Sequence, residues 1–355
     1  MKKSFFSPRG VLLGLVAVLL ALSLAGWAYW SLSALAYRHA IDRWIEEGRA
    51  AGYQISYDDR QMFGFPRHLT MRLINVRWRN ADGIDFRAQA MDLLSVSWIG
   101  HTFEARFKNH VSIAAPVDED GHILMLSAES GHGHVTLDSE GFWRQAQLSL
   151  DDIQGGLAPA YLFHAEKLSL ALARPDQPPK DHHEVGLTLE GAAETMTLPA
   201  AMPAPFGDKA AKFTARLRVM GPVPDVRRRA SVEAWNKDSG IVEFDDFSLS
   251  WGVLSLASKG TVGFDDDLQP EGAFAGTVAN PEKTLQLLMD KGFILLHDAG
   301  MLKSAMDLFA RPSVRGTPGM ELPITVQLGG LFFGPIRIFT FPEIDWPKEP
   351  PPPAR

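Results

Sequence analysis

Residues 244–278 alternate apolar and polar side chains over three successive strand lengths, with turn-forming residues between them. Phe247, Leu249 and Trp251 share one parity, and Ser248 between them takes the other. Because successive side chains of a strand point to opposite faces of a sheet, this pattern predicts strands with one apolar and one polar face. A sheet built from such strands must cover its apolar face with helices, a second sheet or a ligand.

Short strands of this kind recur along most of the chain at spacings of about 8–12 residues. Gly, Asp and Asn residues separate them, as in the hairpin signal NADG at residues 80–83. Residues 230–235 (ASVEAW) read as one of these strands, and helical crossovers between strands are missing, which argues against a doubly wound α/β fold. We predict a mainly β chain of antiparallel curved sheets or a sandwich, with a few short helices and one N-terminal transmembrane helix.

Two short helices are expected in the C-terminal part. Asn280 is placed to act as an N-cap, with Pro281 at the first helical position. A second helix is predicted from Met301 to Phe309. Further on, Gly329-Gly330 suits a two-residue hairpin turn.

The N-terminus has the composition of a membrane anchor. Lys2, Lys3 and Arg9 precede a stretch without charge from residue 10 to residue 37, which includes the apolar segment 11–30. About 20 apolar residues span the roughly 30 Å hydrocarbon layer, and the basic residues orient the N-terminus toward the cytoplasm. We predict an uncleaved anchor that continues into an amphipathic stalk helix. The alternative is a cleavable signal peptide, because Ala34-Leu35-Ala36 satisfies the small-x-small rule.

Proline-rich connections at residues 174–184 and 198–210 are candidate domain boundaries, and the second is preferred. The predicted units are a cytoplasmic tip and anchor (1–36), an N-terminal β-rich unit with the stalk helix (37–205), a C-terminal β-rich unit with a helix pair (206–345) and a disordered Pro-rich tail (346–355).

Composition excludes several classes of function. The formal net charge is -7, with basic residues scattered, so the chain lacks the basic footprint of a nucleic-acid-binding protein. The count of zero cysteines excludes disulfide frameworks, thiolate nucleophiles and Cys-ligated metal centres. A chain of 355 residues with 46% apolar residues is long enough to fold around a sizeable core.

The remaining polar motifs favour structural roles. His132 and His134 have the spacing of two metal ligands on one strand face, and His122 is the nearest third ligand, but a solvent-facing pair is the simpler interpretation. The acidic run 265–267 lacks the spaced acid of an EF-hand loop. No nucleophile elbow, phosphate-binding glycine loop or HExxH motif is present. We predict no catalytic residue, no cofactor and no metal site.

Apolar strand faces are the remaining candidates for a binding surface. The tryptophans that flank strands are expected mainly in core packing, and some of them are candidates for lining a concave surface that accepts acyl chains. The predicted lining residues are Leu254, Leu256, Val262, Phe264, Trp78 and Trp98.

Several motifs together resemble one alphaproteobacterial family. They are the helix ending EEGRAAGY, the segment Phe63-Gly64-Phe65-Pro66 and a C-terminal run that ends in Pro270-Glu271-Gly272. The family is catalogued as domain of unknown function twenty-one twenty-five, and the resemblance extends from Trp30 to about Ile338. It implies no established activity. The repeated strand grammar is also similar, more loosely, to AsmA-like envelope proteins, a class implicated in lipid handling, from which the helix pair departs.

Three functions remain open from the sequence. The first is a non-enzymatic protein of the bacterial inner membrane, single-pass, whose periplasmic C-terminal domain binds lipid or another apolar envelope component on a curved sheet. The second is an envelope scaffold or protein-interaction module with a closed core. The third is a hydrolase whose site no motif reveals. The membrane and a lipid ligand are the predicted partners, and protein partners are unassigned.

Overall fold

The structure is a computed structural model. It describes residues 8–64, 69–95, 102–116, 122–138, 140, 142–158, 161–199, 204–226, 228–294, 300–304, 307, 311–312, 320–333, 336–341 and 343–346, some of them, including residues 8–19, by their backbone only. The helices are α1 (Pro8–Ala50), α2 (Arg229–Lys237) and α3 (Pro281–Asp290), and residues 300–304 are also helical.

Strands make up the rest of the regular structure in the described residues. They are β1 (Gln54–Ser56), β2 (Asp59–Phe63), β3 (Leu69–Arg79), β4 (Asp85–Ser95), β5 (Thr102–Pro116), β6 (Ile123–Leu137), β7 (Trp143–Ala158), β8 (Tyr161–Ala173), β9 (Val185–Thr197), β10 (Lys209–Met220), β11 (Val242–Trp251), β12 (Leu254–Phe264), β13 (Pro270–Ala279), β14 (Arg311–Pro312), β15 (Met320–Gln327), β16 (Gly330–Phe333) and β17 (Ile336–Thr340).

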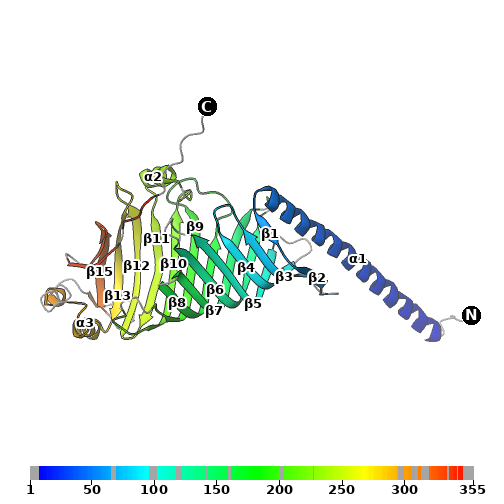
Figure 1. The fold of residues 1–355 in the computed structure, drawn as a ribbon, viewed down its shortest axis with the longest axis horizontal. Helices are drawn as coiled ribbons and strands as arrows, with labels where there is room; N and C mark the ends of the chain where they lie inside the picture. The colour runs from blue at the N-terminus through cyan, green and yellow to red at the C-terminus, as the bar shows by residue number, and fades with distance from the viewer. Residues whose placement is uncertain are drawn as a thin grey trace, which may run out of the picture.

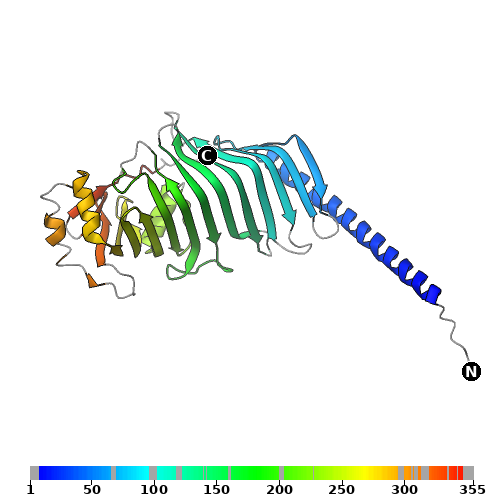
Figure 2. The ribbon, with the colours of Figure 1, turned by 90° about the horizontal axis from the view of Figure 1, so that it is seen from below.

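All seventeen strands belong to one antiparallel sheet. From β3 to β13 each strand pairs with the next one in the chain, and β15 to β17 continue the order. The short strands β1 and β2 both pair with β3, and β14 pairs with β15. Figures 1 and 2 show the result as a long twisted sheet, with α1 leaving one end and α3 at the other. The prediction of a mainly β, antiparallel chain is confirmed, and the arrangement is one open sheet.

The sheet continues across the boundary predicted at residue 205. That position lies in the connection between β9 and β10, and these two strands pair through eleven residue pairs, from Lys209 with Thr197 to Met220 with Val185. The two predicted units therefore share one sheet.

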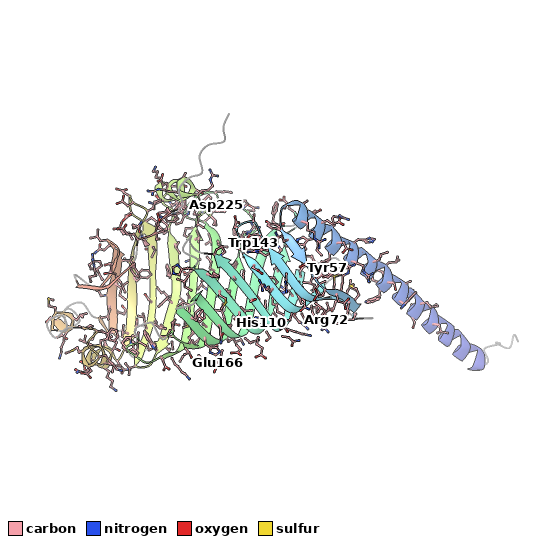
Figure 3. All side chains as sticks on the ribbon, in the orientation of Figure 1. Tyr57, Arg72, His110, Trp143, Glu166 and Asp225 are labelled. Carbon is pink, nitrogen blue, oxygen red and sulfur yellow. The ribbon has the colours of Figure 1, made fainter. Side chains whose placement is uncertain are left out.

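Alternation of side chains is interrupted at the same level in eight consecutive strands, β3 to β10. The pairing skips one or more residues there, and several of the skipped residues have positive φ although they are not glycine. Two of them, His110 of β5 and Glu166 of β8, lie in the middle of their strands and are labelled in the lower part of Figure 3. Such irregularities re-aim side chains and increase local twist. The interrupting residues are Asn75, Gln89, Asn109, His110, Glu129, Asp152, Glu166, Thr195 and Ala211.

The prediction of a strand at residues 230–235 is wrong, because this segment is helix α2. Val232 and Trp235, three residues apart, form its buried face, and Arg229 pairs with Glu233 one turn later at 3.0 Å. The helix packs closely on the following chain, where a Cβ atom on Gly240 would lie 2.2 Å from the Trp235 ring. The apolar residues of so short a segment fit both the period of two of a strand and the period of 3.6 of a helix, and tertiary packing decided between the two structures.

Two details of the C-terminal predictions also change. Helix α3 begins at Pro281 as expected, but Asn280 has φ 52° and its side chain makes no capping hydrogen bond. The hairpin between β15 and β16 turns at Leu328 and Gly329, both with positive φ, rather than at Gly329-Gly330. Of the predicted helix from Met301 to Phe309, residues 301–304 are helical, and parts of the remainder lie outside the described residues.

Helix α1 is continuous through the predicted anchor and stalk. At 1.5 Å per residue its 43 residues extend about 64 Å. It ends just before Gly52, which has φ +90°. Within the described residues, no helix combines the length and the hydropathy needed to cross a membrane. The side chains of residues 11–19, which belong to the predicted span, lie outside the described part of the chain.

Candidate apolar binding face

One face of the sheet, here called the apolar face, carries an unbroken apolar row across twelve strands. At about 4.8 Å between neighbouring strands, this row is roughly 50 Å long. Each member lies directly opposite the next across a strand pair, and no polar side chain interrupts the series. The row is Leu73, Met91, Phe107, Gly131, Leu150, Leu168, Ala193, Phe213, Leu249, Leu256, Val278 and Met320.

A second row lies beyond the interruptions and is also apolar. It crosses eight strands through Val76, Ala88, Val111, Ala128, Ile153, Ala165, Met196 and Ala210. Members of both rows pack into one cluster, in which Met71, Ile153 and Ala165 are fully buried. Since Leu150 and Ile153 belong to the same cluster, the interruption at Asp152 returns the following residues to the apolar face.

The predicted lining residues lie at both ends of this face. Leu254 and Leu256 of β12 are half-buried, and Leu256 belongs to the twelve-strand row. Trp78 of β3 lies near the opposite end, opposite Phe86, with its ring 5.4 Å from that of Tyr53. The structure thus places Trp78 and Leu256 on one surface without bringing them into contact. Trp98 lies outside the described residues.

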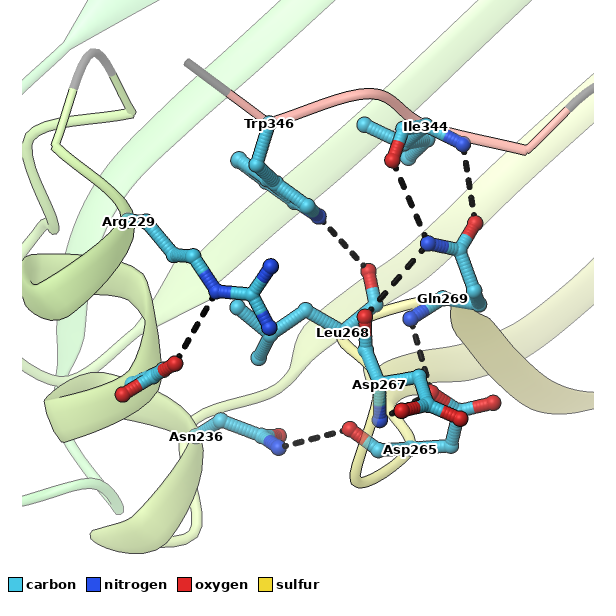
Figure 4. Close-up of polar contacts among 9 residues, drawn as sticks. Arg229, Asn236, Asp265, Asp267, Leu268, Gln269, Ile344 and Trp346 are labelled. Carbon is cyan, nitrogen blue, oxygen red and sulfur yellow. Dashed lines mark hydrogen bonds and ion pairs between the residues drawn. The ribbon is translucent and has the colours of Figure 1, made fainter. Parts of the chain in front are cut away.

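Phe264 and its neighbour Val262 on β12 lie at the end of the face that the protein itself covers. The Phe264 ring contacts Trp235 of α2 and Trp346 of the C-terminal segment, at centroid distances of 6.2 and 5.6 Å. Figure 4 shows the C-terminal segment crossing the β12–β13 turn beside α2. Phe264 therefore has an aromatic environment within the protein and is not part of the open surface.

Hydrogen bonds hold this closed end. The Trp346 indole N–H donates to the carbonyl of Leu268 at 3.0 Å, and Gln269 exchanges two hydrogen bonds with the backbone of Ile344. The Asn236 side chain of α2 bonds the backbone of Phe264. Trp346, which the sequence placed in a disordered tail, is thus fixed to the sheet, and residues 347–355 lie outside the described part of the chain.

Helix α1 covers the other end of the face. Tyr37 and Ile41 pack against the apolar cluster, and Ile45 is buried. Burial raises the pKa of Tyr37 to about 12. Arg60 of β2 pairs with Asp42, and the Arg49 side chain donates to the carbonyl of Ile55. The stalk therefore connects the segment predicted to cross the membrane directly with the apolar face.

Between these covered ends the apolar face is open in the described structure. Phe103, Ile113 and Leu170 are 40%, 39% and 43% exposed, although all three point to the apolar side. A hollow of about 130 Å³ lies on the same face. Its apolar lining residues are Phe86, Phe107, Val111, Ile113, Leu126, Ala128, Leu148 and Leu150.

Small residues leave further room on this face. A Cβ atom on Gly133 of β6 would have its nearest neighbour at 3.7 Å, and one on Gly191 of β9 would lie 3.6 Å from Leu170, so a methyl group would fit at either position in ordinary van der Waals contact. Neither glycine has positive φ, so the backbone does not require glycine at these positions.

Sequence reasoning missed the lining of the hollow. Ala128 and Gly131, or Leu150 and Ile153, have the parity of opposite faces when alternation is counted without a break, although both members of each pair lie on the apolar face. Each pair is separated by the polar residues that interrupt the strand, such as Glu129 and Asp152, the latter with φ 52°. Consecutive polar residues inside an apolar strand pattern are the signal that could have located these breaks.

The opposite, polar face carries the residues considered for metal binding. His132 lies between Arg106 and Ser149, and His134 between Glu104 and Gln147. Among the described residues no group of three His, Cys, Asp or Glu side chains could hold a metal ion. In the acidic run, the Asp265 carboxylate accepts hydrogen bonds from the backbone N–H groups of Asp267 and Gln269, and so it holds a turn.

The comparisons with known proteins give a family without an activity. The model of a family described as "Uncharacterized protein conserved in bacteria (DUF2125)" matches residues 30–342. The chain belongs to this family. The match includes the whole sheet from β1 to β17 and the stalk part of α1, so the DUF2125 region and the folded region coincide. No curated protein and no solved structure matches this DUF2125 chain.

Proposed function

We propose that the protein is a non-enzymatic, single-pass protein of the bacterial inner membrane whose periplasmic sheet binds lipid or another apolar envelope component. The ligand would occupy the open part of the apolar face between the stalk and the closed C-terminal end. The proposal assigns no catalytic residue, no metal site and no cofactor.

The N-terminal helix supports the membrane part of the proposal. Leu20, Leu22, Leu24 and Trp27 are all more than half exposed, and Leu22 lies on the opposite side of α1 from the other three. A helix that is apolar on every side requires apolar surroundings. Lys2 and Lys3 before the apolar segment favour a cytoplasmic N-terminus, which leaves the sheet in the periplasm.

The twelve-strand apolar row is the observation that carries the ligand part. In its middle no described helix or second sheet covers it, so side chains such as Leu170 remain exposed. Continuous apolar surface of this kind marks a binding site on a soluble domain. Each CH₂ group that moves from water to such a surface contributes about 0.8 kcal/mol, so an acyl chain is a suitable occupant.

In-cell photo-crosslinking tests this proposal. A benzophenone amino acid at Leu170 is expected to crosslink to lipid, detected by mass spectrometry of the purified full-length protein. The same probe at Ser169, the adjacent residue on the polar face, is the matched control and is expected to give no lipid adduct. Gly191→Leu, which places a larger side chain against Leu170 on the apolar face, should reduce the lipid adduct.

Two results would contradict it. Crosslinks from Leu170 to polypeptide alone would favour the envelope scaffold, in which a protein partner covers the apolar face. Equal lipid adducts at Leu170 and Ser169 would show that contact with lipid is not specific to the apolar face.

A further inference from the structure

Strands β3 and β4 place three arginine residues together on the polar face, close to the junction with α1. Arg77 lies directly opposite Arg87 across the strand pair, and Arg79 lies opposite Asp85. Like charges in directly opposed positions destabilise an antiparallel pair. Arg77 therefore faces repulsion across this strand pair, and a position that opposes folding locally is a candidate for function.

Asp85 is the one carboxylate in the two cross-strand pairs Arg77–Arg87 and Arg79–Asp85, and it already accepts hydrogen bonds. The Arg87 guanidinium donates to both oxygens of Asp85, at 2.9 and 2.7 Å. These bonds, and more weakly the charges of Arg87, Arg79 and Arg77, hold the pKa of Asp85 below its usual range. Arg77 and Arg79 are exposed, and neither makes an ion pair within the described residues. The group thus keeps two positive charges without a partner.

Neutral donors extend the same rows. Ser56 of β1 lies opposite Arg77, Gln54 lies opposite Arg79, and Ser112 of β5 lies opposite Arg87. Guanidinium groups bind phosphate oxygens through paired, charge-assisted hydrogen bonds, and hydroxyl and amide groups add further donors. The chemistry of this surface therefore matches a phosphate group.

We propose that Arg77, Arg79 and Arg87 form a binding site for a phosphate group, carried either by a lipid headgroup or by a free phosphate compound. The site lies on the opposite face from Trp78 and does not depend on acyl-chain binding. Phosphate binding would offset the repulsion between Arg77 and Arg87 that the folded strands contain.

Calorimetric titration of the full-length protein in non-ionic detergent tests the site. The probes are inorganic phosphate and dihexanoylphosphatidylglycerol below its micelle concentration. Both should bind saturably and more weakly at higher salt concentration. The double substitution Arg77→Gln and Arg79→Gln should weaken binding roughly tenfold or more, because charge-assisted hydrogen bonds are lost. Its melting temperature should be equal to or above that of the wild type, since repulsion is relieved; a purely structural role for the arginines would lower it.

Arg216→Gln is the matched control, because this arginine is also on the polar face but pairs with Glu190 at 2.8 Å. It should retain binding. Binding of inorganic phosphate alone would assign the site to free phosphate, and preferential binding of the diester would assign it to a headgroup. The proposal is overturned if the wild type binds neither probe saturably, or if the double variant binds as the wild type does. Equal loss of binding in Arg216→Gln would overturn it as well.

Discussion

At the scale of single residues, Asp92 is the polar group on which the β3–β5 region most depends. It is buried, and Arg72 donates to both of its carboxylate oxygens at 2.6 and 2.7 Å. Lys108 lies 3.0 Å from the same carboxylate. Because the side chain is only 6% exposed, its two basic partners replace most of the solvation that the carboxylate loses on folding.

Asp92→Asn should lower the free energy of unfolding by about 1–3 kcal/mol, because Arg72 and Lys108 keep their charge but lose their partner. Urea unfolding of the full-length protein at pH 7 measures this. Glu104→Gln is the control, since it removes an exposed partner of Arg106 and should cost no more than about 1 kcal/mol. Equal costs for the two substitutions would mean that burial of Asp92 does not matter.

The same pair predicts a pH dependence. Hydrogen bonds from Arg72 lower the pKa of Asp92, so its stabilising contribution is present above the unfolded pKa of about 3.9 and is lost as pH falls through the folded value. The stability difference between wild type and Asp92→Asn should therefore shrink between pH 5 and pH 3. A difference that stays constant over this range would contradict the assignment.

At the scale of elements, strand β6 contains two glycines that differ in their surroundings. A Cβ atom on Gly131 would lie 2.6 Å from a methyl group of Leu150 and 2.7 Å from the carbonyl oxygen of Ser149, whereas the nearest neighbour of a Cβ atom on Gly133 would lie at 3.7 Å, an ordinary van der Waals distance. Gly131 allows β6 and β7 to approach beneath the twelve-strand row. Gly133 instead has room for one methyl group.

Gly131→Ala should therefore destabilise the protein by about 1–3 kcal/mol through overpacking. Gly133→Ala should be neutral or stabilising by up to about 1 kcal/mol, because alanine restricts the unfolded chain. Thermal unfolding of the two variants makes the comparison within one strand and on one face. Similar destabilisation by both would show that a methyl group does not fit at Gly133.

At the scale of the whole molecule, the proposed topology places the two ends of α1 in different compartments. The chain has no cysteine, so single introduced cysteines report position without background. Ser255→Cys, on the exposed side of β12, should react with a membrane-impermeant maleimide in intact spheroplasts. Lys3→Cys should react only after the membrane is permeabilised. The reverse pattern would contradict the predicted orientation, and labelling of both sites would contradict a membrane-spanning α1.

The sequence alone determined the local architecture of this protein. Period-two alternation identified most strands, including β11 to β13, and Asn80–Gly83 and Pro281 marked a turn and a helix start that the structure confirms. Each of these features depends on neighbours close in the chain, through backbone geometry and turn chemistry. The family also follows from motifs that can be read directly.

Only the tertiary structure decided how the strands combine. One open sheet and a sandwich use the same two-faced strands, and they differ in which distant segments meet. The interruptions near Glu129 and Asp152 change the face of every later residue in their strands, so the apolar face could not be assembled by counting parity. Phe264 was assigned to an open surface because the sequence gives no sign that Trp346, 82 positions later, returns to cover it. Contacts between residues so far apart in the chain depend on the whole fold, whereas the alternation of side chains along a strand depends only on the residues of that strand.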